Sequence, residues 1–188
     1  DDGEILLKGP SVFQMYYENE EATADSFTED GYFKSGDIGE LDSDGFLRIT
    51  DRKKYLIITA AGKNIAPAPI EQKLLQHPLI GQVVVHGDQR KFLSALLTLD
   101  PESLEVWAEQ NGKSFDQAAL SDDADLAAEI ERFVNEVNGS LARYETIKKY
   151  EILPLEFTVE NGFLTPSMKL KRKVIEQEYV GVLDGMYA

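Results

Sequence analysis

The sequence Tyr-Phe-Lys-Ser-Gly-Asp-Ile-Gly at residues 32–39 places one acidic side chain, Asp37, next to glycine. Glycine beside aspartate permits a tight turn, so we expect a turn here with the carboxylate facing outward. A carboxylate in that position can accept hydrogen bonds from a sugar diol. An ordinary surface turn is the alternative, and it is favoured on this stretch alone because Gly-Asp is a common turn dipeptide.

The residues around this segment predict mostly short strands. Asp-Ser-Asp-Gly at residues 42–45 predicts a hairpin turn between two of them. Asn19 is expected to cap a helix over residues 20–27, and the aromatic stretch at 11–17 predicts a short helical turn. The strands are expected at residues 5–8, 32–35, 38–41 and 46–49.

After Asp51 the pattern alternates between helices and strands. The runs at residues 80–86 and 92–99 are joined by a short polar loop, which predicts an antiparallel pair. Gly62 predicts a turn, and the acidic segment 117–125 is expected to be an exposed loop. Further strands are expected at residues 55–59 and 150–153, and helices at 67–77, 104–111, 126–141 and 169–179. The alternation predicts an α+β domain with helices on a small sheet.

The composition narrows the classes of function. The 188 residues fit one domain or two small ones, and a hydrophobic content of 43% suffices for a core. A formal net charge of −15 argues against non-specific binding to nucleic acid or anionic lipid as the main task. Cysteine is absent and histidine occurs only twice, which excludes thiolate catalysis and cysteine-based metal sites and argues against a zinc site.

Two basic groups interrupt this acidic chain. They lie at residues 52–54 and 169–173, and each is a candidate for local anion binding, with a solvated face as the more frequent alternative. No apolar run reaches membrane-spanning length and no signal peptide opens the chain, so the cytoplasm is the expected compartment. Because the chain opens on Asp-Asp-Gly-Glu without a methionine, we expect a piece of a longer protein.

Four blocks of the sequence, taken in order, resemble the adenylate-forming enzymes, which include acyl-CoA synthetases, aryl-CoA ligases, luciferases and adenylation domains. Residues 32–39 look like the family's aromatic-x-x-[Thr/Ser]-Gly-Asp block, and residues 44–54 are similar to its hinge block. Residues 62–71 look like the loop and helix entry that follow, and residues 164–172 resemble the C-terminal lysine block. The Gly-Lys-Asn turn and the Leu-Thr-Pro-x-x-Lys-x-Lys-Arg ending look most like the long-chain fatty-acid branch.

The resemblance implies the C-terminal part of a long-chain fatty-acid–CoA ligase. Residues 1–51 would be the β-barrel-like end of the large N-terminal AMP-binding domain, and residues 52–188 the small mobile α+β lid domain. The family uses ATP and Mg²⁺ to turn a fatty acid into an acyl-adenylate, and coenzyme A then takes the acyl group as a thioester. The family's phosphate loop and acyl pocket lie upstream of these blocks, so the isolated fragment is expected to be inactive and to need the rest of its chain. Peripheral membrane contact is a further expectation.

The resemblance also assigns roles in adenylation. Asp37 matches the aspartate that accepts hydrogen bonds from the two ribose hydroxyls, and Arg52 resembles the arginine that contacts ribose or phosphate. Lys169 matches the catalytic lysine that bridges ATP phosphate and the substrate carboxylate, where a compact cation suits a transition state that gains charge on phosphate. Lys54 falls on the hinge about which the small domain rotates between the two half-reactions.

For the thioester step, the resemblance points to the glycine turn. Gly62 lies on the loop that enters the site, where glycine lets the backbone approach the pantetheine closely. Lys63 either meets a phosphate or faces solvent. Met168 stands where other branches of the family have glycine.

Several neighbouring residues are expected to play no part in the chemistry. Glu71 is interpreted as an acid in the first turn of a helix, and His86 as a structural residue at a strand end. Residues 171–173 are interpreted as a solvated face, with contact to coenzyme A phosphates as a lesser alternative. Trp107, Phe133 and Tyr144 are expected in the core or against a partner.

Three other functions stay open at this point. The chain could be a fragment of a fatty-acyl-AMP ligase, whose turnover would not depend on coenzyme A. It could be a fragment of an aryl-CoA ligase, which an upstream acyl pocket would distinguish. It could also be a non-catalytic binding module that needs no upstream sequence.

Overall fold

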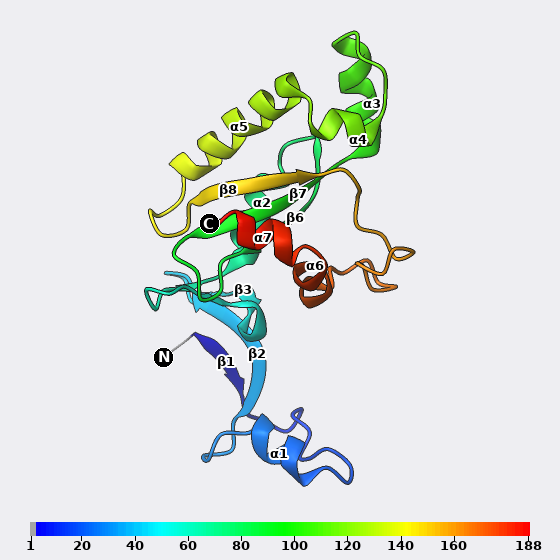
Figure 1. The fold of residues 1–188 in the computed structure, drawn as a ribbon. Coiled ribbons are helices and arrows are strands. Elements are labelled where there is room, and N and C mark those ends of the chain that lie inside the picture. The colour runs from blue at the N-terminus through cyan, green and yellow to red at the C-terminus, as the bar shows by residue number, and fades with distance from the viewer. Residues whose placement is uncertain (1–2) are drawn as a thin grey trace. The chain divides into compact units, whose positions relative to one another are not determined.

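The computed structural model describes residues 3–188, and the chain divides into two compact units, Asp1–Leu56 and Ile57–Ala188 (Figure 1). The domain boundary expected from the sequence lies at residue 51, and residues 1 and 2 of that expected first domain lie outside the described residues. The assignment of the first unit to a larger AMP-binding domain stays a prediction.

The first unit is built on an antiparallel sheet with the strand order β1-β2-β3. Its elements are β1 (Glu4–Leu7), α1 (Glu20–Ser26), β2 (Phe33–Leu41) and β3 (Leu47–Arg52). The Asn19 side chain accepts a hydrogen bond from the Ala22 N–H at 3.0 Å and begins α1, as its sequence predicts. The hairpin turn at residues 42–45 is also confirmed, with the Gly45 N–H donating to the Asp42 carbonyl at 3.1 Å.

Two expectations for this unit are wrong. Strand β2 continues through Gly36 and Asp37 with an irregularity in place of a turn: Ile38 lies opposite Glu4 of β1 and Asp37 opposite Arg52 of β3, while Gly36 has a φ of +72° where the β1–β2 register shifts. The pairing of Asp37 and Ile38 keeps the segment extended, and the glycine accommodates the irregularity within the strand. Residues 11–17 form no helix, and Phe13 instead packs edge-on against neighbouring aromatic rings at centroid distances of 4.9 to 5.7 Å.

The second unit is organised by a sheet with the order β6-β7-β8. Its strands are β6 (Ile80–His86), β7 (Leu93–Leu99) and β8 (Ile147–Leu153). The antiparallel β6–β7 pair is confirmed, and β8 lies parallel to β7. A parallel neighbour needs a long crossover, which is made by α3 (Pro101–Gln110), α4 (Gln117–Ser121) and α5 (Ala124–Gly139). All seven residues of the central strand β7 are buried.

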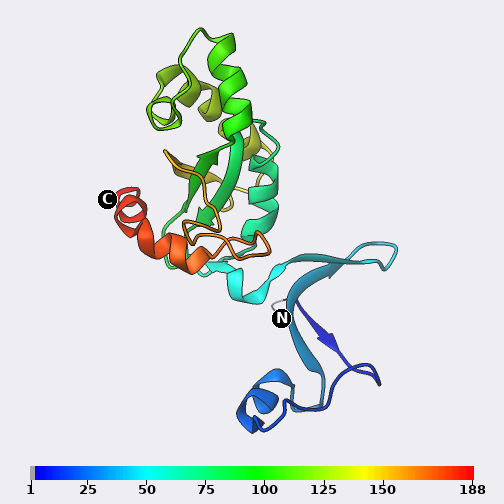
Figure 2. The same cartoon turned by 90° about the vertical axis from the view of Figure 1, so that its right-hand side faces the viewer.

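Helices cover both faces of this sheet. Alternate residues of a strand point to opposite faces, so Val83 and Leu97 pack with α2 (Pro67–Leu74), α3 and α5, whereas Val84 and Leu96 pack with the C-terminal helices. Those helices are α6 (Arg172–Glu178) and α7 (Val180–Gly185). Figure 2 shows α2 and the α6–α7 pair on opposite sides of the strands. The layered arrangement confirms the α+β fold.

Local differences from the expected elements have local causes. The acidic segment expected to be a loop contains α4, which the Asp116 carboxylate caps by accepting from the Ala118 and Ala119 N–H groups. The strand expected at residues 55–59 is reduced to β4 (Ile57–Ile58), preceded by a 3₁₀ turn, η1 (Lys53–Tyr55), and paired with β5 (Asn64–Ile65). None of the helices within residues 3–188 combines the length and apolar character needed to cross a bilayer.

Candidate functional site

Asp37 and Arg52 form an ion pair across the β2–β3 hairpin. The Arg52 Nε lies 2.8 Å from the Asp37 Oδ1, because the two residues are register partners. The Asp37 side chain is 24% exposed, and the pair therefore lies at the surface of the first unit. A carboxylate has more acceptor sites than one guanidinium contact uses. The strand pairing thus brings together the two residues expected to bind the nucleotide.

Lys54 lies in η1, two residues before the boundary between the two compact units. Its ammonium lies 4.9 Å from the centroid of the Tyr55 ring. A position close to this boundary is compatible with the hinge assignment, and the hinge role itself stays a prediction.

Lys169 is presented by a tight hairpin in the second unit, and the helix expected from residue 169 begins only at Arg172. The bridge between Leu164 and Leu170 closes this hairpin. The Thr165 N–H donates to the Lys169 carbonyl at 2.8 Å, and the Lys169 N–H donates to the Thr165 Oγ1 at 3.0 Å. The Lys169 side chain is exposed and forms no ion pair with the residues that the structure describes.

Lys63 lies in a hairpin that is held by the same two kinds of hydrogen bond as the Lys169 hairpin. The Thr59 N–H donates to the Lys63 carbonyl at 3.0 Å, and the Lys63 N–H donates to the Thr59 Oγ1 at 3.1 Å. In each loop the residue before the lysine has a positive φ, +73° at Gly62 and +59° at Met168. Met168 therefore adopts the left-handed conformation that glycine reaches without strain. A Cβ at Gly62 would meet open space, so that loop is also open to a ligand.

A basic pocket of about 390 Å³ adjoins the Gly62 loop. Its lining residues are Thr59, Ala61, Lys63, Lys91, Phe92, Arg143, Tyr144, Thr146 and Lys148. Four of these are cations and none is acidic, in a chain whose net charge is −15. The Lys63 ammonium lies 5.7 Å from the centroid of the Tyr144 ring, which is exposed rather than in the core. The pocket can bind a compact anion that carries several charges, next to an aromatic face.

Sequence reasoning missed most of this pocket. Lys91, Arg143 and Lys148 come from segments about fifty residues apart, and they meet because β7 and β8 are parallel with Leu93 opposite Ile147. The spacing of residues along the sequence does not reveal which residue of β7 lies opposite which residue of β8. Of the four pocket cations, Lys63 alone lies beside a recognisable sequence feature, the glycine turn at Gly62.

The roles expected for Glu71 and Arg172 are wrong. Glu71 is buried in the second turn of α2 and accepts from the Arg172 Nη1 at 2.7 Å, with a second contact from the Nη2 to the Glu71 Oε2. The Val85 N–H also donates to the Glu71 Oε1 at 2.8 Å. Arg172 is therefore half of a buried bidentate ion pair and does not belong to a solvated face. Among residues 3–188, no cluster of three or more histidine, aspartate or glutamate side chains is arranged to hold a metal ion.

Comparisons with known proteins agree with this arrangement. FadD15 of Mycobacterium tuberculosis, a long-chain-fatty-acid–CoA ligase, is 48% identical over 189 residues, which cover 100% of this chain and 31% of the relative. The adenylation domain of a carboxylate reductase from Mycobacterium chelonae superposes with a TM-score of 0.78 at 30% identity, over 98% of this chain and 27% of that one. The o-succinylbenzoate coenzyme A synthetase of Bacillus subtilis, in complex with ATP and a magnesium ion, gives a TM-score of 0.61 at 32% identity, over 90% of this chain and 29% of that one.

The family model described as the AMP-binding enzyme C-terminal domain matches residues 54–188. This match covers more than half of the chain and contains Lys54, the Gly62 loop, the basic pocket and the Lys169 hairpin. The resemblance of the sequence to the adenylate-forming enzymes is therefore confirmed, and the chain belongs to the family of AMP-binding enzyme C-terminal domains.

Proposed function

We propose that this chain is the C-terminal part of a long-chain fatty-acid–CoA ligase. The chain spans 31% of the length of the FadD15 relative and aligns with it from end to end at 48% identity. The fatty-acid carboxylate would attack the α-phosphate of ATP to give an acyl-adenylate and pyrophosphate, and the coenzyme A thiol would then displace AMP to form the thioester. Residues 1–51 would belong to the large AMP-binding domain, and residues 52–188 would act as its lid.

The basic pocket is the observation that supports coenzyme A as the acceptor. Coenzyme A ends in a phosphorylated adenosine diphosphate, which is a compact polyanion with an aromatic base. The pocket offers four cations and the exposed Tyr144 ring, in a volume within the roughly 300–1,000 Å³ range of ligand pockets. Its position beside Gly62 would direct the pantetheine arm along the loop expected to enter the site. No observation favours a fatty-acyl-AMP ligase or a non-catalytic module.

The nucleotide half of the reaction would use residues of both units. Asp37 would accept the ribose hydroxyls, with Arg52 holding the carboxylate in place through the 2.8 Å contact. Lys169, exposed on its hairpin, would bridge the ATP phosphate and the fatty-acid carboxylate. Mg²⁺ would accompany the ATP phosphates, because magnesium commonly binds through substrate phosphates.

The proposed use of coenzyme A is tested by calorimetric titration of the 188-residue chain with coenzyme A. Arg143→Gln removes one pocket cation, and we expect the Kd to rise about tenfold, the size of one charge-assisted contact. Arg132→Gln is the matched control, because Arg132 is exposed and lies outside the pocket, and its Kd should equal that of the wild type. Equal weakening by both variants, or no effect of Arg143→Gln, would remove the basic pocket as the support for coenzyme A.

A further inference from the structure

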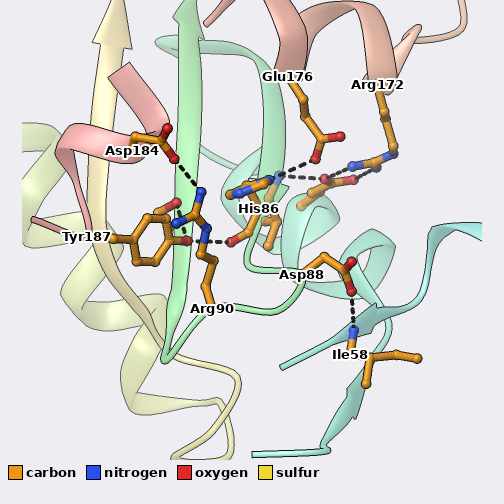
Figure 3. A network of polar contacts seen from close by, with 11 residues as sticks. Ile58, His86, Asp88, Arg90, Arg172, Glu176, Asp184 and Tyr187 are labelled. Carbon is orange, nitrogen blue, oxygen red and sulfur yellow. Dashed lines mark hydrogen bonds and ion pairs between the residues drawn. The ribbon is translucent and has the colours of Figure 1, made fainter. Parts of the chain in front are cut away.

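The side chain of Arg90, in the turn between β6 and β7, contacts helix α7 at the C-terminus (Figure 3). The Arg90 Nη2 forms an ion pair with the Asp184 Oδ1, and the guanidinium lies 4.8 Å from the centroid of the Tyr187 ring. The Tyr187 hydroxyl lies 2.8 Å from the Ser94 Oγ and donates to the His86 carbonyl at 3.3 Å. Burial raises the pKa of the Tyr187 phenol, so this donor stays protonated.

The backbone of the same turn holds the Gly62 loop. The Ala60 N–H donates to the Arg90 carbonyl at 2.9 Å, and the Gln89 N–H donates to the Ile58 carbonyl at 2.9 Å. The Asp88 carboxylate accepts from the Ile58 N–H at 3.0 Å, as Figure 3 also shows. Arg90 therefore binds α7 with its side chain and the Gly62 loop with its carbonyl.

Lys91, the next residue along, lines the basic pocket with Lys63. The position of the turn thus sets the distance between cations contributed by two separate segments. We propose that Arg90, Asp184 and Tyr187 are positioning residues, through which α7 fixes the Gly62 loop and the basic pocket for the thioester step. The catalytic consequence rests on the proposed function, whereas the coupling of α7 to the loop does not.

The coupling is tested by amide hydrogen exchange in the 188-residue chain. We expect Arg90→Gln to accelerate exchange at Ala60 by about threefold, because loss of an ion pair between exposed side chains raises the population of the open loop modestly. Asp184→Asn should act in the same direction, and Arg90→Lys should restore part of the protection.

Lys113→Gln is the matched control. Lys113 likewise pairs with carboxylates, Asp123 and Asp125, and lies 5.5 Å from the centroid of the Trp107 ring, but it contacts neither loop nor pocket. Exchange at Ala60 should match the wild type in this variant. Unchanged exchange at Ala60 in Arg90→Gln would overturn the proposal. Equal acceleration at Leu97 of the central strand would also overturn it, because it would mean general destabilisation.

The catalytic consequence is measured in the longer polypeptide that the relatives have. Arg90→Gln should slow thioester formation relative to adenylate formation by about threefold, and should raise the KM for coenzyme A, whereas Lys113→Gln should leave that ratio unchanged. A parallel loss of both half-reactions would contradict a role for Arg90 in positioning the loop. Absence of coenzyme A-dependent turnover in the wild type would refute the proposed function and leave the exchange result standing.

Discussion

Replacing Arg172 by methionine should destabilise the second unit strongly. The Arg172 and Glu71 side chains are 16% and 8% exposed, so the substitution leaves a carboxylate buried without its cationic partner. Removing one member of a buried ion pair costs about 3–5 kcal/mol. Glu71 keeps its hydrogen bond from the Val85 N–H, so we expect the lower end of that range, about 3 kcal/mol.

The single tryptophan makes this loss measurable. Trp107 lies in α3, is 7% exposed and reports unfolding of the second unit by its fluorescence. With a urea m-value of about 2 kcal/mol/M, a loss of about 3 kcal/mol lowers the unfolding midpoint by about 1.5 M. The double variant Glu71→Gln, Arg172→Met removes both charges together and should recover more than half of the loss, because no unpaired charge stays buried.

Arg132→Met provides the control, because it removes the same group from an exposed position on α5. Its midpoint should shift by less than about 0.3 M, as for an ordinary surface substitution. A similar small shift for Arg172→Met would refute the assignment of a buried, energetically coupled pair. A double variant less stable than Arg172→Met alone would refute it as well.

Three further predictions follow from the loops and from one histidine. Lys169→Ala should abolish adenylate formation in the longer polypeptide while thioester formation from supplied acyl-adenylate persists, and stopped-flow assays of each half-reaction would check this. Thr59→Val and Thr165→Val should each lower the free energy of unfolding by about 1 kcal/mol in urea titrations, because each removes the acceptor of one backbone N–H. Burial lowers the pKa of His77 from 6.5, so the folded state binds fewer protons there than the unfolded chain. Stability should therefore fall as the pH drops from 6.5 toward the lowered pKa, and His77→Gln should reduce that slope in pH-dependent melting.

Elements with local signals were predictable from the sequence. The Asn19 cap and the hairpin turn at residues 42–45 depend on residues within a few positions of one another, and the β6–β7 pair joins two strands that are consecutive in the sequence. The course of β2 through Gly36 was not, because it depends on the pairing of Asp37 with β3 and of Ile38 with β1. That pairing changes the meaning of Asp37, which is an ion-paired strand residue and not the tip of a turn.

The residues of the candidate site also differ in whether the sequence could identify them. Asp37, Lys54, Gly62 and Lys169 lie in short blocks that a resemblance can identify, whereas the basic pocket depends on a parallel register between strands separated by α3, α4 and α5. Glu71 and Arg172 were misjudged for a related reason. They are 101 residues apart, and the sequence around each residue does not indicate that the other lies beside it. Long-range packing therefore decides which of the many charged residues bind each other and which are available to a ligand.

The end of β6 connects the Lys63 hairpin with the Lys169 hairpin through hydrogen bonds and an ion pair. The Val85 N–H binds Glu71, which binds Arg172 three residues after Lys169. The turn that follows His86 binds the loop before Lys63 through the Arg90 carbonyl. Both loops are thus anchored within six residues of the same strand end, and their own Thr–Lys backbone contacts keep each one short and closed. We expect a movement of one lysine toward a nucleotide site to carry the other lysine with it. If both serve successive steps of one reaction, as we propose, we expect the exchange between them to occur by rotation of the second unit, with the backbone change in the residues just before Ile57, including Lys54.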